Sequence, residues 1–318
     1  GKPLGVTVAA TLAVNQVGIA ILYVITVCQN AELLRAGDEG RPAWYWYPLV
    51  GAIAWACAAR GETLAHVSGV SLLGLLSVFA VGAFVVAAGV GKSAPDAACN
   101  PVSLPQTLSG LGTAIFAYGG HPVYPEVQGG MASPGQFKTV VWWAFGLMTL
   151  LFLLVAGSAW GAYGCWVHGY VLDNLEDSWW RSAAVWGITL HLLCAIPIVL
   201  LPVMRLLEEK AAPWAGFQAV RLAIVVAVVS VAFLVPFFSD VLALLGGLTE
   251  NLLVFIFPVL FFYMTHGIER SVAGAAKAAL HATLTLLSLA ILFVGSSASF
   301  SNIIQKWDQY HLRLLPAR

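Results

Sequence analysis

Few side chains in this sequence are suited to chemistry, and two titratable ones lie close together in one apolar stretch. His121 and Glu126 stand within Thr107 to Met131, TLSGLGTAIFAYGGHPVYPEVQGGM. Small changes in surroundings move the pKa of a histidine across the physiological range, so His121 is a candidate proton carrier, with a structural hydrogen bond as the alternative. Glu126 is a second candidate, because it opens an expected helical piece whose N-terminus stabilises a carboxylate. The alternative is that Glu126 lies in a water-filled vestibule on the cytosolic side and has no role in transport.

Glu250, in the stretch GGLTENLL, is the other acidic residue well inside an apolar run. An ionised carboxylate that faces lipid costs a few kcal/mol, so Glu250 must face protein or water. This makes Glu250 a third proton-coupling candidate. Asp240 opens the same run, where a gate and a helix cap are competing roles.

The stretch around His121 is interrupted where a helix would otherwise continue. Gly119 and Gly120 favour non-helical backbone, and Pro122 and Pro125 remove backbone donors. The pattern predicts two half-helices that meet at an irregular joint. Irregular backbone at membrane depth persists only where it is buried in protein or lines a cavity. The joint therefore predicts a ligand site, with a simple kink or a re-entrant loop as the alternatives.

Composition sets the class of protein. Hydrophobic residues make up 60% of the 318 residues and charged residues only 9%, against roughly 25% charged residues in a soluble globular domain. The chain is therefore predicted to be a polytopic membrane protein. Its formal net charge of zero gives no indication of a nucleic-acid partner.

Nine apolar segments are expected to cross a bilayer as helices, which takes about 20 mostly apolar residues each. The second segment is short and rich in tryptophan. The connecting loops are brief, so residues 1–318 are expected to form a single all-α membrane domain with a short tail at 302–318. The nine segments are Gly5–Cys28, Trp44–Ala59, Val67–Val90, Thr107–Met131, Val140–Gly164, Ala183–Met204, Ala219–Phe237, Val241–Met264 and Ala275–Ser297.

The five cysteines show no C-x-x-C spacing, so a metal or redox centre is not expected. The distribution of Lys and Arg favours an orientation with Gly1 on the cytosolic side. The loops that carry Cys99 and Cys165 would then share the outer side, where a disulfide can persist. The sequence does not decide whether Cys99 and Cys165 form a disulfide or remain two free thiols.

Two other classes of protein lack support in the sequence. A membrane enzyme would need a metal cluster or a nucleophile pair, but the seven histidines show no H-E-x-x-H spacing. The chain is therefore not expected to be an enzyme. A channel would need rings of polar residues along several helices, and no such pattern is present.

The segment GTAIFAYGGHPVYPEVQ resembles the sixth transmembrane helix of the amino acid/auxin permease family, which includes plant lysine/histidine transporters and vesicular inhibitory amino acid transporters. The F-A-Y-x-G-H run and the triplet Glu126, Val127 and Gln128, which is similar to the family's E-I-Q, carry this resemblance. HLLCAIPIVLLPV resembles the family's eighth helix, and GGLTENLLVFIFPVLFFY resembles its tenth. The resemblance covers nearly the whole chain.

The resemblance implies an all-α fold of the LeuT-type inverted repeat. The family has eleven helices and this chain aligns from the third onward, so the first two are expected to be missing. In that fold the site lies between the broken first and sixth helices. The chain is thus expected to hold one half of a site and not to transport by itself.

The resemblance also implies where a substrate would bind. The backbone of Phe116 to Gly120 would offer carbonyls and amides to the ammonium and carboxylate of an amino acid. The rings of Phe116 and Tyr118 would close over the substrate side chain, or they pack between helices. The implied substrate-binding residues are Phe116, Ala117, Tyr118, Gly119, Gly120 and Tyr23.

Polar residues elsewhere have two interpretations each. Tyr23, with Asn15 and Gln16 on the same segment, faces a pathway if the family register holds. The alternative for Asn15 and Gln16 is hydrogen bonding between helices, which also applies to Thr189 and His191.

The implied function is secondary active amino acid transport, coupled to protons by symport or antiport. Sodium-coupled members of the wider group place hydroxyls on the eighth helix, whereas Leu193 to Ala195 has none, which favours protons. The alternatives are a sodium-coupled transporter and a transporter-like amino acid sensor. The implied partners are an amino acid and the lipid bilayer, with no cofactor and no nucleic acid. The implied location is the plasma membrane or a vacuolar or vesicular membrane.

Overall fold

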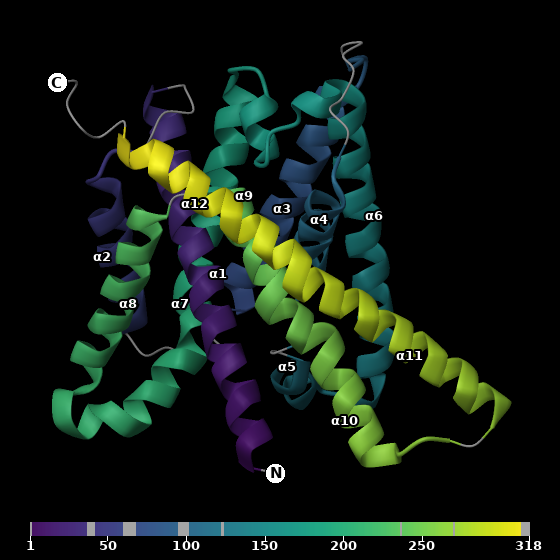
Figure 1. Cartoon of the computed structure of the whole chain (residues 1–318). Helices are drawn as coiled ribbons and strands as arrows, with labels where there is room; N and C mark the ends of the chain where they lie inside the picture. Colours follow the sequence, from purple (N-terminus) through teal and green to yellow (C-terminus); the bar gives the residue numbers. More distant parts are fainter. Residues whose placement is uncertain are drawn as a thin grey trace. The chain divides into compact units, whose positions relative to one another are not determined.

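The computed structural model of the chain describes residues 2–36, 42–59, 68–94, 102–121, 124–235, 237–269 and 271–312. All regular elements in these residues are helices, which confirms the all-α prediction (Figure 1). Within these described residues, six helical spans are long and apolar enough to cross a membrane, and two shorter apolar helices accompany them. The six spans are Leu4–Arg35, Pro134–Trp166, Trp179–Glu209, Phe217–Leu234, Phe238–His266 and Val272–Trp307.

The nine predicted segments fall on helices of this structure, but a count of nine membrane crossings stays a prediction. The prolines inside α7 do not end that helix, because neighbouring groups in a membrane bundle can satisfy the backbone that a proline frees. The α-helices are α1 (Lys2–Ala36), α2 (Trp46–Ala59), α3 (Ser68–Gly89), α4 (Leu104–Ala117), α5 (Tyr124–Gly130), α6 (Phe137–Tyr163), α7 (Trp179–Ala215), α8 (Phe217–Leu234), α9 (Phe238–Leu245), α10 (Phe257–His266), α11 (Val272–Ala290) and α12 (Ser296–Leu312).

The chain forms two compact units. Unit 1 comprises Gly1–Gly18, Pro101–Phe137 and Ser239–Arg318, and unit 2 comprises Ile19–Asn100 and Lys138–Phe238. Helix α1 contributes its first half to unit 1 and its second half to unit 2. The prediction of one membrane domain stays a prediction.

Unit 1 is built around α4, which packs against two longer helical segments that contain π-helical turns. The first segment joins α9 to α10 through the π-helical turns η6 (Gly246–Glu250) and η7 (Leu252–Ile256). The second joins α11 to α12 through η8 (Ile291–Gly295), and Figure 1 shows it as one long rod. Both η6 and η8 contact α4.

Glycines allow the close approach of α4 to these two segments. A Cβ on Gly246 would overlap the carbonyl oxygen of Gly112, and a Cβ on Gly295 would lie 2.8 Å from the carbonyl oxygen of Leu108. Between α4 and α12, the hydroxyls of Ser109 and Ser299 are 2.8 Å apart. Small residues commonly let helix backbones meet in membranes, so these contacts place α4 firmly within unit 1.

The start of α4 is set by a capping box. The Ser103 hydroxyl accepts from the backbone N–H of Gln106, and the Gln106 side chain accepts from the backbone N–H of Ser103 at 3.0 Å. These two bonds satisfy backbone donors that a helix N-terminus leaves unpaired. Helix α4 therefore begins at Leu104, before the predicted start at Thr107.

Unit 2 is held by a buried ion pair where α2, α7 and α8 meet. The guanidinium of Arg221, on α8, donates to the carboxylate of Glu208, on α7, and both side chains are almost fully buried. The same guanidinium donates to the Ala58 carbonyl of α2 at 2.5 Å. One arginine thus connects three helices of this unit.

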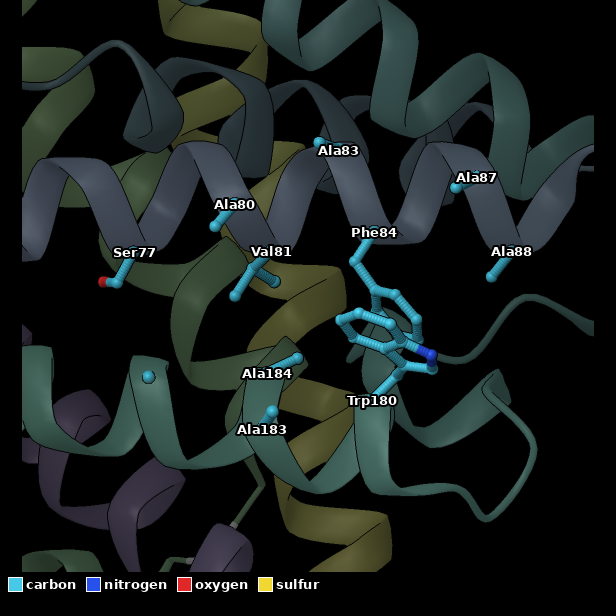
Figure 2. Close-up of a pocket in the computed structure, with 11 residues that line it drawn as sticks. Ser77, Ala80, Val81, Ala83, Phe84, Ala87, Ala88, Trp180, Ala183 and Ala184 are labelled. Atoms are coloured by element: carbon cyan, nitrogen blue, oxygen red, sulfur yellow. The ribbon is translucent and has the colours of Figure 1, made fainter.

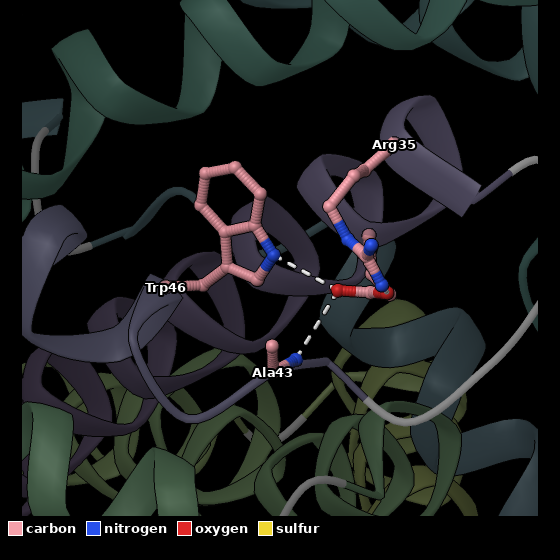
Figure 3. Close-up of polar contacts among 4 residues, drawn as sticks. Arg35, Ala43 and Trp46 are labelled. Carbon is pink, nitrogen blue, oxygen red and sulfur yellow. Dashed lines mark hydrogen bonds and ion pairs between the residues drawn. The ribbon is translucent and has the colours of Figure 1, made fainter.

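A second polar contact in unit 2 joins the end of α1 to the start of α2. Glu32 is buried, and its carboxylate pairs with Arg35. Oε2 of Glu32 also accepts from the Trp46 indole at 2.9 Å and from the Ala43 backbone at 3.2 Å (Figure 3). Charge-assisted bonds of this kind are stronger than neutral ones, so Glu32 organises this end of the unit.

Glutamine at position 32 is expected to lower the midpoint of thermal unfolding by a few degrees. The E32Q amide has one acceptor oxygen in place of two and no charge for Arg35, so buried donors lose their partner. The decrease can be measured by tryptophan fluorescence of the protein in detergent. Glu176 is the matched control, since its exposed carboxylate pairs with Lys92 and exposed pairs contribute little. Equal losses in E32Q and E176Q would contradict the assignment.

The structure describes four of the five cysteines. Cys165 is disulfide-bonded, whereas Cys28, Cys57 and Cys194 are free. The predicted partner, Cys99, lies outside the described residues, so this pairing stays a prediction.

The pairing with Cys99 can be tested by labelling thiols in the denatured, unreduced protein. C99S is expected to add one labelled thiol, because Cys165 would lose its partner. C57S is expected to remove one, since Cys57 is free. An unchanged reactivity of Cys165 in C99S would contradict the pairing with Cys99.

Candidate functional site

The predicted break between two half-helices is confirmed in unit 1. Helix α4 ends at Ala117 and α5 begins at Tyr124. The amide of Tyr118 donates to the Ile115 carbonyl at 3.1 Å, and the amide of Gly119 donates to the Phe116 carbonyl at 2.9 Å. The Phe116 carbonyl is therefore already paired once, and any ligand contact there would use its second lone pair.

The carboxyl group of Glu250 lies against this break. Glu250 is only 2% exposed and belongs to η6, and π-helical turns are frequent at functional sites. A Cβ placed on Gly119 would lie 2.5 Å from Oε1 of Glu250 and 2.7 Å from Oε2. The structure thus brings two of the predicted site residues together, and it confirms that Glu250 faces protein.

Asn15 bonds to one oxygen of this carboxyl group, and Thr249 bonds to Asn15; we call Asn15, Thr249 and Glu250 the Glu250 cluster. Asn15 Nδ2 donates to Glu250 Oε1 at 2.9 Å, and the Thr249 hydroxyl donates to Asn15 Oδ1 at 2.6 Å. All three residues are buried. The other carboxyl oxygen, Oε2, is buried and has no hydrogen-bond partner among the described residues.

The carboxyl group of the Glu250 cluster has no cationic partner among the described residues. Within the part of the chain that the structure describes, no Lys or Arg forms an ion pair with Glu250. The described lysines of unit 1 that form ion pairs do so with Asp240 and Glu269. A buried ionised carboxylate with one neutral donor is costly, so this site is suited to take up a proton or another cation.

His121 lies in the same break, between the end of α4 and the start of α5 and nearer to α5. Its ring packs on Tyr124 with a centroid distance of 4.9 Å, and Tyr124 packs edge-on against Phe137 at 5.8 Å. The Nδ1 atom of His121 is buried and makes no hydrogen bond to a described residue. The structural hydrogen bond predicted as the alternative is therefore not made by Nδ1.

The remaining predicted residues lie at several places. Phe116 packs against η6, with its Cβ 3.0 Å from where a Gly246 Cβ would be. Tyr23 belongs to the part of α1 in unit 2. Glu126 falls in α5, but its side chain is outside the described residues. Asp240, for which a gate and a helix cap are the competing predictions, forms an ion pair with Lys306 of α12.

A cavity of about 640 Å³ lies between α3 and α7 in unit 2 (Figure 2). Its lining is almost entirely apolar, with the rings of Phe84 and Trp180 stacked at 6.3 Å. The hydroxyl of Ser77 donates to the Gly74 carbonyl at 2.7 Å. No ionisable side chain among the described residues lines this cavity, so it is poorly suited to the charged ends of an amino acid, whose burial without partners is costly.

Metal binding has no support in the described residues, where no group of three or more His, Cys, Asp or Glu side chains could hold an ion. The Glu250 cluster supplies instead one free carboxyl oxygen beside the C-terminus of α4, which carries partial negative charge. Both features attract a cation. The arrangement is suited to reversible binding of a proton or an ammonium group.

The sequence interpretation missed the pairing of Asn15 with Glu250. Interhelical hydrogen bonding was the stated alternative for Asn15, and the structure confirms it. The same holds in unit 2 for Thr189, which accepts from Asn30 at 2.9 Å. A signal for the partner was present, because Asn15 and Glu250 are both polar residues inside apolar runs, and buried polar groups need partners.

Broken membrane helices line the ligand sites of many transporter folds. Comparison with known proteins gives the family. The profile of the family described as transmembrane amino acid transporter protein matches residues 1–301, and the chain belongs to that family. The resemblance to amino acid/auxin permeases is confirmed. The chain is an integral membrane protein of a transporter family, not of an enzyme family.

Named relatives are plant transporters. The chain is 29% identical to amino acid transporter AVT1D of Arabidopsis thaliana, over 54% of this chain and 32% of AVT1D. It is 28% identical to AVT3B of the same plant, over 93% of this chain and 74% of AVT3B. It is 27% identical to auxin transporter-like protein 3 of Oryza sativa subsp. japonica, over 65% of this chain and 40% of that protein. The chain spans about a third of the length of AVT1D. No solved structure matches the chain.

Proposed function

We propose that this chain is the membrane part of a secondary active amino acid transporter that couples substrate movement to protons. The family membership supports amino acid transport. The observation that carries the proton coupling is Glu250, which is buried at the helix break with one carboxyl oxygen unpaired. Protonation removes the cost of the buried charge, so Glu250 can alternate between two states during transport.

In this proposal the substrate binds at the break between α4 and α5. Residues Phe116 to Gly120 would contact it through backbone groups, because the C-terminus of α4 attracts an ammonium group. Tyr23, His121 and Glu126 remain further candidates, the first for substrate contact and the other two for proton transfer. Ionisable residues inside a membrane protein commonly mark such pathways.

Hydrogen bonding in the Glu250 cluster favours protons over sodium as the coupling ion. A hard cation such as sodium is best held by several oxygen atoms. Asn15 presents its amide nitrogen to Oε1 of Glu250, and its own oxygen accepts from Thr249. Oε1 of Glu250 and Oδ1 of Asn15, two oxygens that a sodium ion would need, thus each already accept a hydrogen bond. A proton needs only the free Oε2.

The proposed function can be tested by flux measurements in liposomes that contain the full-length protein. Uptake of radiolabelled L-amino acids is expected when a pH gradient is imposed and not when a sodium gradient replaces it. The location in a plasma, vacuolar or vesicular membrane can be read from a fluorescent fusion. Flux driven by sodium alone would overturn the proton coupling, and substrate binding without any flux would indicate a sensor.

A further inference from the structure

The cavity between α3 and α7 in unit 2 is bounded at both of its ends. At one end the two helices touch, because a Cβ on Gly187 would lie 3.6 Å from Cβ of Ser77. At the other end the rings of Phe84 and Trp180 stack with 6.3 Å between their centroids (Figure 2). A ligand would therefore enter from the side, between the two helices.

The open side of the cavity faces the hydrocarbon of the bilayer. Helix α7 belongs to the membrane span Trp179–Glu209, and α3 contains the apolar stretch Gly74–Gly89. Three alanines that line the cavity, Ala80, Ala83 and Ala183, are exposed. Because the medium around an apolar membrane span is lipid, lipid rather than water reaches this cavity.

The Trp180 end of the cavity lies at the boundary between hydrocarbon and water. Trp179 and Trp180 open the α7 span, and both are exposed and stacked on each other. Tryptophan is enriched at the two interfaces of a membrane, where one part of the ring is apolar and its N–H is polar. A ligand in the cavity would thus have its polar end beside Trp180 and its apolar end beside Ser77.

The size and lining of the cavity suit one rigid apolar molecule. Its volume of about 640 Å³ is that of a small-molecule site, about 300–1,000 Å³. From Ser77 to Ala88 it follows α3 for about 16 Å at the rise of an α-helix, which accommodates a fused-ring system with part of a hydrocarbon tail. Fused rings have little torsional freedom to lose on binding, whereas a flexible acyl chain must give up much of its freedom. The small lining residues, which leave an even surface, are Ala80, Ala83, Ala87, Ala88, Ala183, Ala184 and Gly187.

The charges beside the Trp180 end favour a neutral polar group over a phosphate. Lys92, which follows α3, pairs with Glu176 at 2.9 Å. Arg181, which follows Trp180, is buried and donates through Nε to the Leu172 carbonyl at 3.2 Å. A lipid phosphate binds best to a cation that is not already paired, and neither of these two cations meets that condition. A single hydroxyl group needs only one neutral donor or acceptor.

The indole of Trp180 supplies such a donor. Figure 2 shows its nitrogen on the Ala88 side of the ring, at the end of the cavity that lies nearest the interface. An indole N–H donates and cannot accept, so it matches the oxygen of a hydroxyl group. The cavity thus combines an even apolar surface with one donor at its interfacial end.

We propose that this cavity binds one sterol molecule from the surrounding bilayer. The fused rings lie on the alanine surface between α3 and α7, the hydroxyl oxygen accepts from the Trp180 N–H, and the tail points toward Ser77. The sterol contacts both helices, whose other faces already meet in the buried cluster that contains Val85 and Val185. Sterol binding therefore stabilises unit 2, because a ligand that binds only the folded state favours that state.

The experiment uses the full-length protein in phosphatidylcholine vesicles that contain a tritiated sterol with a photoreactive diazirine on its rings. After irradiation, label is expected in peptides of α3 and α7, and unlabelled sterol is expected to compete. A183F fills the cavity with an aromatic ring and is expected to lower the labelling about tenfold or more, as overpacking does. A156F is the matched control, because Ala156 is exposed on α6 and does not line the cavity. Its labelling is expected to equal that of the unmodified protein.

A second variant tests the hydrogen bond. W180F keeps an aromatic ring but lacks the indole N–H, so its affinity for the sterol is expected to fall about twofold to tenfold, the range for one hydrogen bond. A sterol analogue without the hydroxyl group is expected to bind W180F and the unmodified protein equally. An equal loss for both ligands would show that the hydroxyl does not bind at Trp180.

Thermal unfolding in the same vesicles separates loss of the site from loss of the fold. Sterol is expected to raise the unfolding midpoint of the unmodified protein and of A156F, but not that of A183F. Should A183F not fold, A80F decides, since Ala80 is exposed on the facing helix and lines the same cavity. The proposal is overturned if α3 and α7 take up no label, if the filled variant is labelled like the unmodified protein, or if oleic acid competes as well as unlabelled sterol. The last result would assign the cavity to an acyl chain.

Discussion

Alanine at position 119 is expected to lower amino acid transport by about tenfold to a hundredfold. The added methyl group would lie 2.5 Å from Oε1 and from Cδ of Glu250, well inside normal contact distance. Overpacking of this kind typically costs about 1–3 kcal/mol, which corresponds to such a loss of binding. The expected result is a G119A protein that folds and reaches the membrane but binds its substrate weakly. Uptake assays and a thermal unfolding curve together measure both effects.

A matched control and a compensating change make this prediction specific. Gly129 lies in α5 with no atom within 4 Å of its added Cβ, so G129A is expected to leave transport unchanged. E250D withdraws the carboxyl group by one methylene and should relieve the contact with Ala at 119. The double variant G119A/E250D is therefore expected to recover part of the activity that G119A loses, because the two positions touch. Strictly additive losses would show that the contact does not limit transport.

The positions of the helices could be predicted from apolar length, but their exact limits could not. The break after Ala117 follows from its glycines and prolines, which is why it was found. The start of α4 depends on Ser103 and Gln106, whose capping box was overlooked although its spacing is visible in the sequence. The π-helical turns η6 and η8 had no such signal, since they depend on how the segments pack.

The candidate site was predictable residue by residue and not as an arrangement. Glu250 and Asn15 each stand out as polar groups in apolar runs, yet their hydrogen bond joins helices far apart in the chain, and no local pattern encodes that. The sequence favours Gly119 at the break for its backbone freedom. Its φ angle is not among the positive values in the described residues, so the glycine is needed for the space that Glu250 occupies. The helix break is where it was predicted, whereas the role of Gly119 as a site residue stays a prediction.

Alanine at position 246 is expected to have the largest effect on stability in unit 1. A Cβ on Gly246 would overlap the carbonyl oxygen of Gly112 and lie 2.6 Å from its carbonyl carbon. Both are backbone atoms of α4, which cannot turn away as a flexible side chain would. The two helices must separate, which loosens α4 and, with it, the contact between Gly119 and Glu250. We expect G246A to lose at least about 1–3 kcal/mol of unfolding free energy and to bind no substrate.

The control for this change lies on the same helix that Gly246 contacts. Gly110 of α4 has no atom within 4 Å of an added Cβ, and alanine is favoured over glycine in a helix interior by about 1 kcal/mol. G110A is therefore expected to raise the unfolding midpoint while G246A lowers it, in scans of the two proteins in the same detergent. Opposite signs from the same chemical change would show that helix separation, rather than helix propensity, governs this unit. An unfolding midpoint for G246A equal to that of the unmodified protein would mean that α4 and η6 are not in backbone contact, and the Glu250 site would then lack its support.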